Sequence, residues 1–371
     1  MSEVASVASG AAAAGSATVY LGMSGGVDSS LSAVLLKEQG YHVVGVYMKN
    51  WSRDLPGMKC PWAEDLADAK RVAVRLGIDF EVFDFEKEYK QKVVDYMLDE
   101  FKKGNTPNPD IMCNQEIKFK LFYDVARERG ADFIATGHYA RVGMAAGPAT
   151  PALLKAVDEN KDQTYFLYRI SEDALKHTIF PIGDMYKKDV KALAAKKGLD
   201  NAYKKESMGV CFVGEVGIKD FLKEYIDEKP GEIRELKTGR VLGAHEGAVF
   251  YTLGQRHGLN IGGGLPYYVV KKDIAKNIVY VSRDLNAAEL WTDELKLKDV
   301  IMRNDDWRNR VGDGCAVPFE VRLRHRAPLI PATFDPDNSV VKFAEKIKAP
   351  AAGQSVVFYS GDVCLGGGIV V

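Results

Sequence analysis

The sequence predicts an α/β fold with a parallel sheet, followed by a small central domain and a C-terminal β-barrel. Three observations favour this architecture. Strand and helix patterns alternate from Thr18 to Thr136, a glycine-rich loop joins the first strand to the first helix, and short β-like runs follow Pro230. Single helices between strands imply crossover connections, and therefore a mostly parallel sheet covered on both faces.

The elements of the alternating part follow from local signals in chain order. Apolar runs predict strands at residues 18–23, 42–48, 78–85 and 131–136. Amphipathic patterns predict helices at 28–39, 64–76, 86–103 and 116–129, and Gly40, Gly104 and Gly130 end three of them. Ligands of such sheets bind beyond the carboxyl ends of the strands. We therefore expect the functional residues at 22–28, 49–61 and 137–139.

The chain of 371 residues is long enough for two or three domains. We expect a disordered leader at 1–17, a catalytic domain at 18–215 that includes a lysine-rich helical segment at 171–205, a small central domain at 216–285, and a barrel domain at 286–371. Residues 143–152 are rich in Gly, Ala and Pro, which predicts a loop tip. The β-like runs after Pro230 lie at 267–270, 278–281, 316–323, 340–343 and 355–359.

Composition narrows the class of protein. The 46% apolar and 27% charged residues are typical of a soluble globular protein, and the net charge of −1 indicates no particular class of partner. The five cysteines have no zinc-finger spacing and their odd number does not indicate a disulfide scaffold, so a reducing cytoplasm fits best. No apolar run approaches the roughly 20 residues that span a membrane. The cysteines are Cys60, Cys113, Cys211, Cys315 and Cys364.

The strongest motif is the loop between the first strand and the first helix. Its adjacent glycines allow close approach to a polyanion, and the helix start offers unpaired N–H groups. Asp28 could cap the helix or hold Mg²⁺. The loop lacks the Gly-Lys-Ser/Thr ending of a Walker A motif, which argues against γ-phosphoryl transfer. The segment comprises Gly22, Met23, Ser24, Gly25, Gly26, Val27, Asp28, Ser29 and Ser30.

Two cysteines lie in polar, motif-like surroundings. Two prolines stiffen the stretch before Cys113, which predicts that the cysteine lies in a rigid polar loop, and Asp110 lies three residues before it. Cys211 lies between Gly209 and Gly214. Sulfur transfer needs one cysteine that carries a persulfide and a second thiolate that attacks it. The alternative is that both are buried structural residues, and this is our interpretation of Cys60, Cys315 and Cys364.

Basic residues offer weaker signals. Arg322, Arg324 and Arg326 alternate, so on a strand they would face one side, either toward phosphates or simply toward solvent. The lysine pairs at 187–188, 196–197 and 204–205 are interpreted as solvated helix faces.

At this point the sequence resembles the tRNA-specific 2-thiouridylases of the PP-loop ATP pyrophosphatase superfamily, from about Thr18 to Val371. Several independent motifs in one order carry the resemblance. The matching blocks are 22–30, 48–51, 106–114, 135–139, 161–163 with 165–167, 209–215, 251–257 and 364–368. One departure is Met208, where the family more often has threonine, and the leader has no counterpart.

The resemblance implies a site and a reaction. ATP would be held by Gly22–Ser29, with Met48 and Gly137 near the adenosine, and Mg²⁺ would assist. The family adenylates O2 of the wobble uridine in Lys, Glu and Gln tRNAs and then replaces that oxygen with sulfur. Cys211 matches the persulfide carrier and Cys113 the attacking thiol, which forms an internal disulfide with it. A cysteine desulfurase or sulfur-relay protein would supply the sulfur.

The resemblance also implies contacts with the RNA. Asn108, Pro109 and Asp110 would meet the target base in the anticodon loop, with Asp110 a candidate acid or base. The residues at tRNA-contacting positions are His138, Lys161, Asp162, Gln163, Arg324, His325 and Gln354. Two alternatives stay open on sequence grounds: another PP-loop ligase acting on a small metabolite, and a non-catalytic tRNA-binding protein that uses ATP as a ligand.

Overall fold

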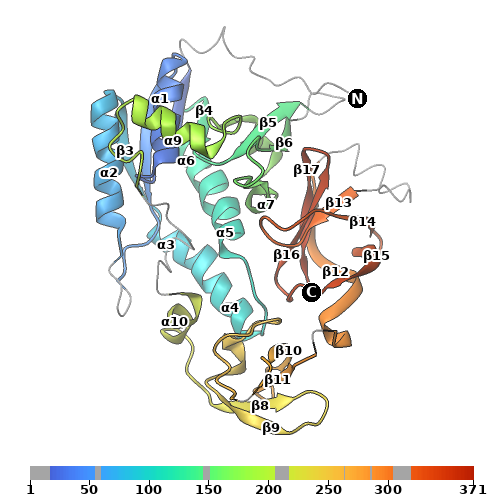
Figure 1. Ribbon diagram of the computed structural model, residues 1–371. Coiled ribbons are helices and arrows are strands. Elements are labelled where there is room, and N and C mark those ends of the chain that lie inside the picture. Colours follow the sequence, from blue (N-terminus) through green and yellow to red (C-terminus); the bar gives the residue numbers. More distant parts are fainter. Residues whose placement is uncertain are drawn as a thin grey trace.

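The computed structural model describes residues 17–54, 60–144, 151–204, 217–262, 264–284, 286–303 and 319–371. Cys211 and Cys315 lie outside these residues, as do nearly all of the expected leader and the segment 205–216. Within the described residues, no helix is long and apolar enough to cross a membrane. Figure 1 shows a helix-flanked sheet, a barrel beside it, and a smaller β-domain below both.

The first part of the chain forms a five-stranded parallel sheet in the order β3-β2-β1-β4-β7. This confirms the predicted parallel sheet, to which the structure adds the short strand β7. The strands are β1 (Thr18–Gly22), β2 (His42–Lys49), β3 (Asp79–Asp84), β4 (Phe133–Thr136) and β7 (Thr178–Ile179).

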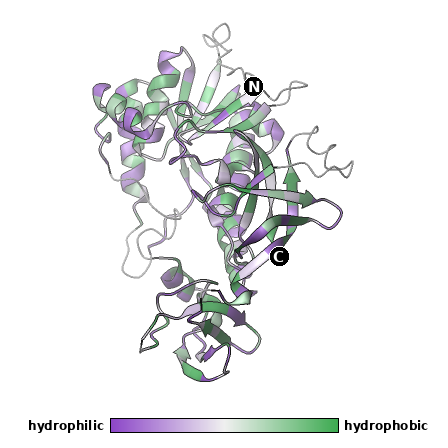
Figure 2. Ribbon diagram, turned by 45° about the vertical axis from the view of Figure 1, so that its right-hand side comes forward, coloured by the Kyte–Doolittle hydropathy of each residue, from purple (hydrophilic) through white to green (hydrophobic). Residues whose placement is uncertain are grey.

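Helices cover both faces of this sheet, as expected for crossover connections. Alternation along β1 sends Val19 and Leu21 into a core with α1 (Val27–Glu38), α2 (Trp62–Leu76) and α9 (Lys187–Lys196), whereas Tyr20 enters the core on the other face. Hydrophobic residues concentrate in the strands, and the helices carry both kinds (Figure 2). The core on the Tyr20 face contains α3 (Glu86–Tyr89), α4 (Tyr96–Lys102), α5 (Pro109–Met112) and α6 (Phe122–Glu128).

Two of the predicted helices differ in detail. The helix predicted at 86–103 is continuous but has a π-helical turn at Lys90–Asp95. The helix predicted at 116–129 begins at Pro109, because Asn108 caps it and proline suits its first turn, and it is π-helical over Cys113–Leu121. Cys113 therefore lies in a helix and not in a loop.

The segment predicted as helical at 171–205 is more mixed. It contains α8 (Glu172–Lys176), β7 and α9, with turns between them, and it follows the short helix α7 (Thr164–Leu167). The loop tip predicted at 143–152 is too wide. The hairpin strands β5 (Ala140–Met144) and β6 (Pro151–Lys155) extend into that range, and residues 145–150 lie outside the described residues.

The central domain is a four-stranded sheet in the order β10-β11-β8-β9, preceded by α10 (Ile218–Lys223). Its strands are β8 (Gly231–Glu235), β9 (Val241–His245), β10 (Tyr268–Asp273) and β11 (Ile278–Ser282), with short 3₁₀ turns at Ala248–Phe250 and Ala288–Leu290.

The last part of the chain forms a closed six-stranded antiparallel barrel, which confirms the predicted C-terminal barrel. The strands follow the order β12-β15-β14-β13-β16-β17, and β17 returns to β12. The β5–β6 hairpin of the first domain also pairs with the start of β17. The strands are β12 (Trp291–Met302), β13 (Phe319–Arg322), β14 (Ile330–Asp335), β15 (Val340–Lys348), β16 (Ser355–Ser360) and β17 (Val363–Val370).

Glycines permit the tight closure of this barrel. A Cβ atom at Gly366 would lie 1.9 Å from the Ile301 carbonyl oxygen, and one at Gly367 would lie 2.3 Å from that of Val356. Strand β17 thus approaches both of its neighbours too closely for any side chain at these positions. This accounts for the Gly-Gly-Gly run near the end of the sequence.

Candidate nucleotide and thiol site

The phosphate loop connects the carboxyl end of β1 to α1, where sheets of this kind bind ligands. Gly25 has a φ of +78°, and a Cβ there would lie 2.5 Å from the Asp65 carbonyl oxygen of α2, so glycine is required. The N-cap of α1 is Gly26, and no side chain caps the helix. The first-turn N–H groups therefore remain available to an anion.

Serine hydroxyls brace the loop from inside. The Ser24 N–H donates to Ser29 Oγ at 3.2 Å, and the hydroxyls of Ser29 and Ser30 donate to the Gly26 carbonyl at 3.1 and 2.9 Å. Ser30 is fully buried and Ser29 nearly so. These two hydroxyls fix the backbone, whereas the exposed Ser24 is available to a ligand.

The predicted adenosine neighbours pack directly on this loop. A Cβ at Gly22 would lie 2.8 Å from Met48 Cε, which places the end of β2 beside the start of the loop. A Cβ at Gly137 would lie 2.8 Å from the Ser29 amide nitrogen. Met48 at the end of β2 and Gly137 after β4 thus both pack on the phosphate loop.

Asp28 does not act as a helix cap, since its carboxylate is used elsewhere. The Lys187 ammonium group binds both carboxylate oxygens at 2.7 Å, and the Tyr139 hydroxyl donates to Oδ1 at 2.9 Å. Lys187 is buried, so its interpretation as part of a solvated helix face was wrong. Because Asp28 is neutralised by an ammonium group, it is a poor ligand for Mg²⁺.

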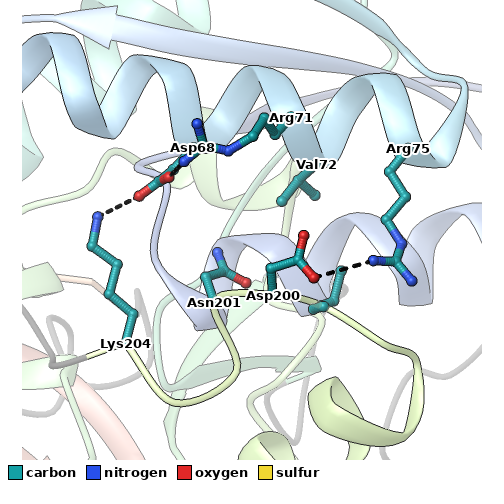
Figure 3. Close-up of a pocket in the computed structure, with 8 residues that line it drawn as sticks. Asp68, Arg71, Val72, Arg75, Asp200, Asn201 and Lys204 are labelled. Carbon is teal, nitrogen blue, oxygen red and sulfur yellow. Dashed lines mark hydrogen bonds and ion pairs between the residues drawn. The ribbon is translucent and has the colours of Figure 1, made fainter.

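A second lysine predicted to be solvated is also paired. Lys204 binds Asp65 at 2.9 Å and Asp68 at 2.6 Å, and both acidic residues belong to the helix that packs on Gly25. Figure 3 shows this region, where residues of α2 and of the segment 199–204 line a cavity of about 240 Å³. Asn201 lies in its wall and contacts the phosphate loop.

The predicted base-contacting residues form the start of the helix that carries Cys113. The Asn108 side chain accepts hydrogen bonds from the N–H groups of Asp110 and Ile111 at 3.1 and 3.3 Å. Burial raises the pKa of Asp110 above its ordinary value of 3.8, and the Lys118 ammonium group opposes this. Cys113 is buried, with 3% of its surface exposed.

His138 connects this helix to the phosphate loop. His138 follows Gly137. The centroid of its ring lies 5.7 Å from that of Phe119, which belongs to the same helix as Cys113. Burial, followed by the charge of Lys118, lowers the pKa of His138 well below 6.5, so the imidazole is neutral at pH 7. The Lys118 ammonium group thus lowers the pKa of both Asp110 and His138.

Of the predicted tRNA-contacting residues at 161–163, two are engaged inside the protein. Gln163 accepts a hydrogen bond from the Tyr139 N–H at 2.8 Å. The Asp162 carboxylate is 1% exposed, binds Arg322 at 2.7 Å and accepts from the Thr164 hydroxyl at 2.9 Å. Asp162 therefore lies beneath the surface, while Lys161 is partly exposed.

The three alternating arginines do not share a strand face. Strand β13 ends at Arg322, which turns inward to Asp162 and also lies over the Tyr359 ring at 5.1 Å. Arg324 and Arg326 are exposed in the turn that follows. The prediction that the three share one strand face, whether toward phosphates or toward solvent, is wrong because it assumed that the strand continues past residue 322.

Two remaining predicted contacts have clear surroundings. His325 packs on Phe166 with ring centroids 4.6 Å apart, and burial lowers its pKa to about 4. Gln354 donates from Nε2 to the Thr106 carbonyl at 2.6 Å, and the Thr106 N–H donates to Ala352 at 2.7 Å. The barrel thus holds the stretch that leads into the Asn108–Cys113 helix.

Among the remaining cysteines, Cys60 and Cys364 are buried, in agreement with their structural interpretation. Burial raises the pKa of both thiols, that of Cys364 to about 12. Within the described residues, no group of three His, Cys, Asp or Glu side chains could hold a metal ion.

Lys187 and Asn201 belong to the site but were not predicted, and Tyr139 was expected only as part of the segment 137–139. Tyr139 and Lys187 hold Asp28 across 111 and 159 residues of sequence, and Asn201 reaches Gly25 across 176. Only Tyr139 gave a signal, as a member of a matching block. The other two lie in a lysine-rich segment whose spacing resembles an ordinary amphipathic helix.

The fold and the site define an α/β nucleotide-binding protein with a phosphate loop at the strand ends, joined to a small β-domain and a barrel. Three family models match in order: the "tRNA methyl transferase HUP domain" at 17–215, the "tRNA methyl transferase PRC-barrel domain" at 219–283 and the "Aminomethyltransferase beta-barrel domain" at 297–370.

Curated relatives cover nearly the whole chain. A tRNA-specific 2-thiouridylase from Listeria monocytogenes serotype 4a is 47% identical over 353 residues, which are 95% of this chain and 94% of the relative. One from Bacillus subtilis strain 168 is 44% identical with the same coverage. Among solved structures, an NH3-dependent NAD synthetase from Campylobacter jejuni matches 52% of this chain and 69% of its own at 21% identity and a TM-score of 0.29. The chain belongs to the tRNA-specific 2-thiouridylase family.

Proposed function

We propose that this protein uses ATP to thiolate C2 of the wobble uridine in tRNA, with Lys, Glu and Gln tRNAs as substrates. The observation that carries this proposal is the bridge made by Gly137 and His138. Gly137 packs on the amide of Ser29 in the phosphate loop, and His138 packs on the helix that contains Asp110 and Cys113. An adenylating loop and a sulfur-handling helix thus share one edge of the sheet.

In the adenylation step, uridine O2 attacks the α-phosphorus of ATP and pyrophosphate leaves. The N–H groups at the start of α1 and the Ser24 hydroxyl would bind the departing phosphates, since they are fixed before the reaction. The lysine–aspartate pair beside the loop keeps the Asp28 charge from repelling them. A uridine in an anticodon loop is already single-stranded, which lowers the cost of placing it in the site.

Asp110 is placed to handle the proton of the target base. Its raised pKa lets it hold or accept a proton closer to neutrality than an exposed aspartate does. His138, whose ring packs on Phe119 of the same helix, presents an uncharged imidazole. We propose that Asn108 and Pro109, which shape this helix start, position Asp110 against the pyrimidine.

In the sulfur-transfer step, Cys211 would carry a persulfide loaded by a cysteine desulfurase or a sulfur-relay protein. The Cys113 thiolate attacks the Cys211 sulfur, the persulfide S–S bond breaks, and the terminal sulfur replaces AMP at C2. A Cys113–Cys211 disulfide results, so a thiol reductant must regenerate both cysteines. Burial of Cys113 protects this chemistry from water.

We propose that Mg²⁺ accompanies the bound ATP. The described residues contain no metal-binding cluster, and Asp28 is occupied by Lys187. We therefore assign no protein ligand to the ion and no step to it. The substrate and the thiol chemistry suit a cytoplasmic protein.

The test is pyrophosphate release in the presence of tRNA, with the Cys113→Ser variant and a matched Cys364→Ser control. Wild-type protein should release pyrophosphate only when a substrate tRNA is present. Cys113→Ser should retain one round of tRNA-dependent release but form no 2-thiouridine, whereas Cys364→Ser should retain both. Full thiolation by Cys113→Ser, or equal pyrophosphate release by wild type with and without tRNA, would contradict the proposal.

A further inference from the structure

Asn201 lies behind the phosphate loop, in the segment between α9 and Lys204. Its side chain is nine-tenths buried in the wall of the cavity seen in Figure 3. The Nδ2 group donates to the Gly25 carbonyl at 2.8 Å and to the Ser30 hydroxyl at 2.8 Å. Ser30 in turn donates to the Gly26 carbonyl at 2.9 Å. One amide group therefore controls the carbonyls of both glycines in the loop.

Fixing a carbonyl also fixes the amide that follows it. In a trans peptide the C=O and the next N–H point in opposite directions. With the Gly25 and Gly26 carbonyls drawn toward Asn201 and Ser30, the N–H groups of Gly26 and Val27 point away from them. These are the amides at the open start of α1, which has no side-chain cap.

The orientation of the Asn201 amide is unambiguous, because a flipped amide would place Oδ1 against the Gly25 carbonyl. In the native orientation Oδ1 is buried without a hydrogen-bond partner among the described residues. An unpaired buried acceptor is a cost to folding. The native fold thus contains an unpaired Asn201 Oδ1, while the Nδ2 group of the same side chain fixes the loop.

We infer that Asn201 is a positioning residue for nucleotide binding, which presets two loop amides toward the phosphates of ATP. The inference rests on the proposed use of ATP at this loop. Lys187 and Asn201 are both buried polar side chains beside the loop, but they have different roles. Lys187 neutralises the charge of Asp28, whereas Asn201 orients the backbone.

The experiment compares Asn201→Asp and Asn201→Ala with wild type. Asn201→Asp keeps the shape but replaces the donor with an oxygen that repels the Gly25 carbonyl, and Asn201→Ala removes the donor. Asn286→Asp, at an exposed turn between the last strand of the central domain and the barrel, is the matched control for the added charge. Calorimetry on the full chain measures binding of α,β-methylene-ATP, together with the Tm and tRNA affinity of each variant.

We expect Asn201→Ala to weaken binding of the analogue about three- to ten-fold and Asn201→Asp about ten-fold or more, with tRNA affinity and Tm close to wild type. Binding by both folded variants within two-fold of wild type would overturn the inference. So would parallel losses of Tm and tRNA affinity, or failure of both variants to fold, because these indicate a general structural role. Failure of the wild type to bind the analogue would instead refute the proposed function.

Discussion

The buried pair of Asp162 and Arg322 ties the catalytic domain to the barrel, and breaking it should be costly. The side chains are 1% and 10% exposed and their charged atoms are 2.7 Å apart. In Arg322→Met the Asp162 carboxylate keeps only hydrogen bonds from Thr164 and Ala156. Removal of one partner of a buried ion pair lowers the free energy of unfolding by about 3–5 kcal/mol. We expect a loss in this range.

The double variant Asp162→Asn/Arg322→Met separates the charge effect from lost packing. Because it leaves no buried charge unpaired, it should recover much of the stability lost in Arg322→Met. Urea unfolding followed by tryptophan fluorescence measures both, with exposed Arg326→Met as the control, which should stay within about 0.5 kcal/mol of wild type. A loss below about 1 kcal/mol in Arg322→Met, or a double variant less stable than the single one, would refute the reasoning.

Three further predictions concern the site and its surroundings. Because burial raises the pKa of Asp110, kcat/KM for tRNA should rise with pH through that raised pKa, and Asp110→Asn should abolish this acid limb along with most activity. Lys187→Met should raise the KM for ATP about ten-fold by leaving Asp28 unpaired beside the phosphates, and adding Asp28→Asn should reverse much of the rise, as steady-state kinetics would reveal. Native protein at pH 8 should leave Cys364 unmodified by iodoacetamide, because burial raises its thiol pKa to about 12, and mass spectrometry of the alkylated protein checks this.

The phosphate loop and the sheet were predictable because their signals are local. Gly25 and Gly26 are adjacent in sequence, and each strand is recognisable from a short apolar run. The side chains that support the loop were not predictable in this way. Asn201 and Lys187 meet the loop only after the chain has passed through several further strands and helices, and no spacing rule connects residues so far apart.

The errors have equally specific causes. The prediction assumed that Arg322, Arg324 and Arg326 lie on one strand, but β13 ends at Arg322. Cys113 was expected in a loop because two prolines precede it, but Pro109 instead begins the helix that Asn108 caps. Asp162 matched a tRNA-contacting position by alignment of motifs, whereas its burial depends on an arginine 160 residues away.

The proposed function depends on one chemical outcome, the appearance of sulfur at C2 of a tRNA uridine. Purified protein would be incubated with unmodified Lys tRNA, ATP, Mg²⁺ and a sulfur donor, and the digested nucleosides analysed by mass spectrometry. We expect 2-thiouridine at the wobble position with wild type and none with Cys113→Ser. Absence of 2-thiouridine with wild type, in a reaction where a known 2-thiouridylase produces it, would contradict the account.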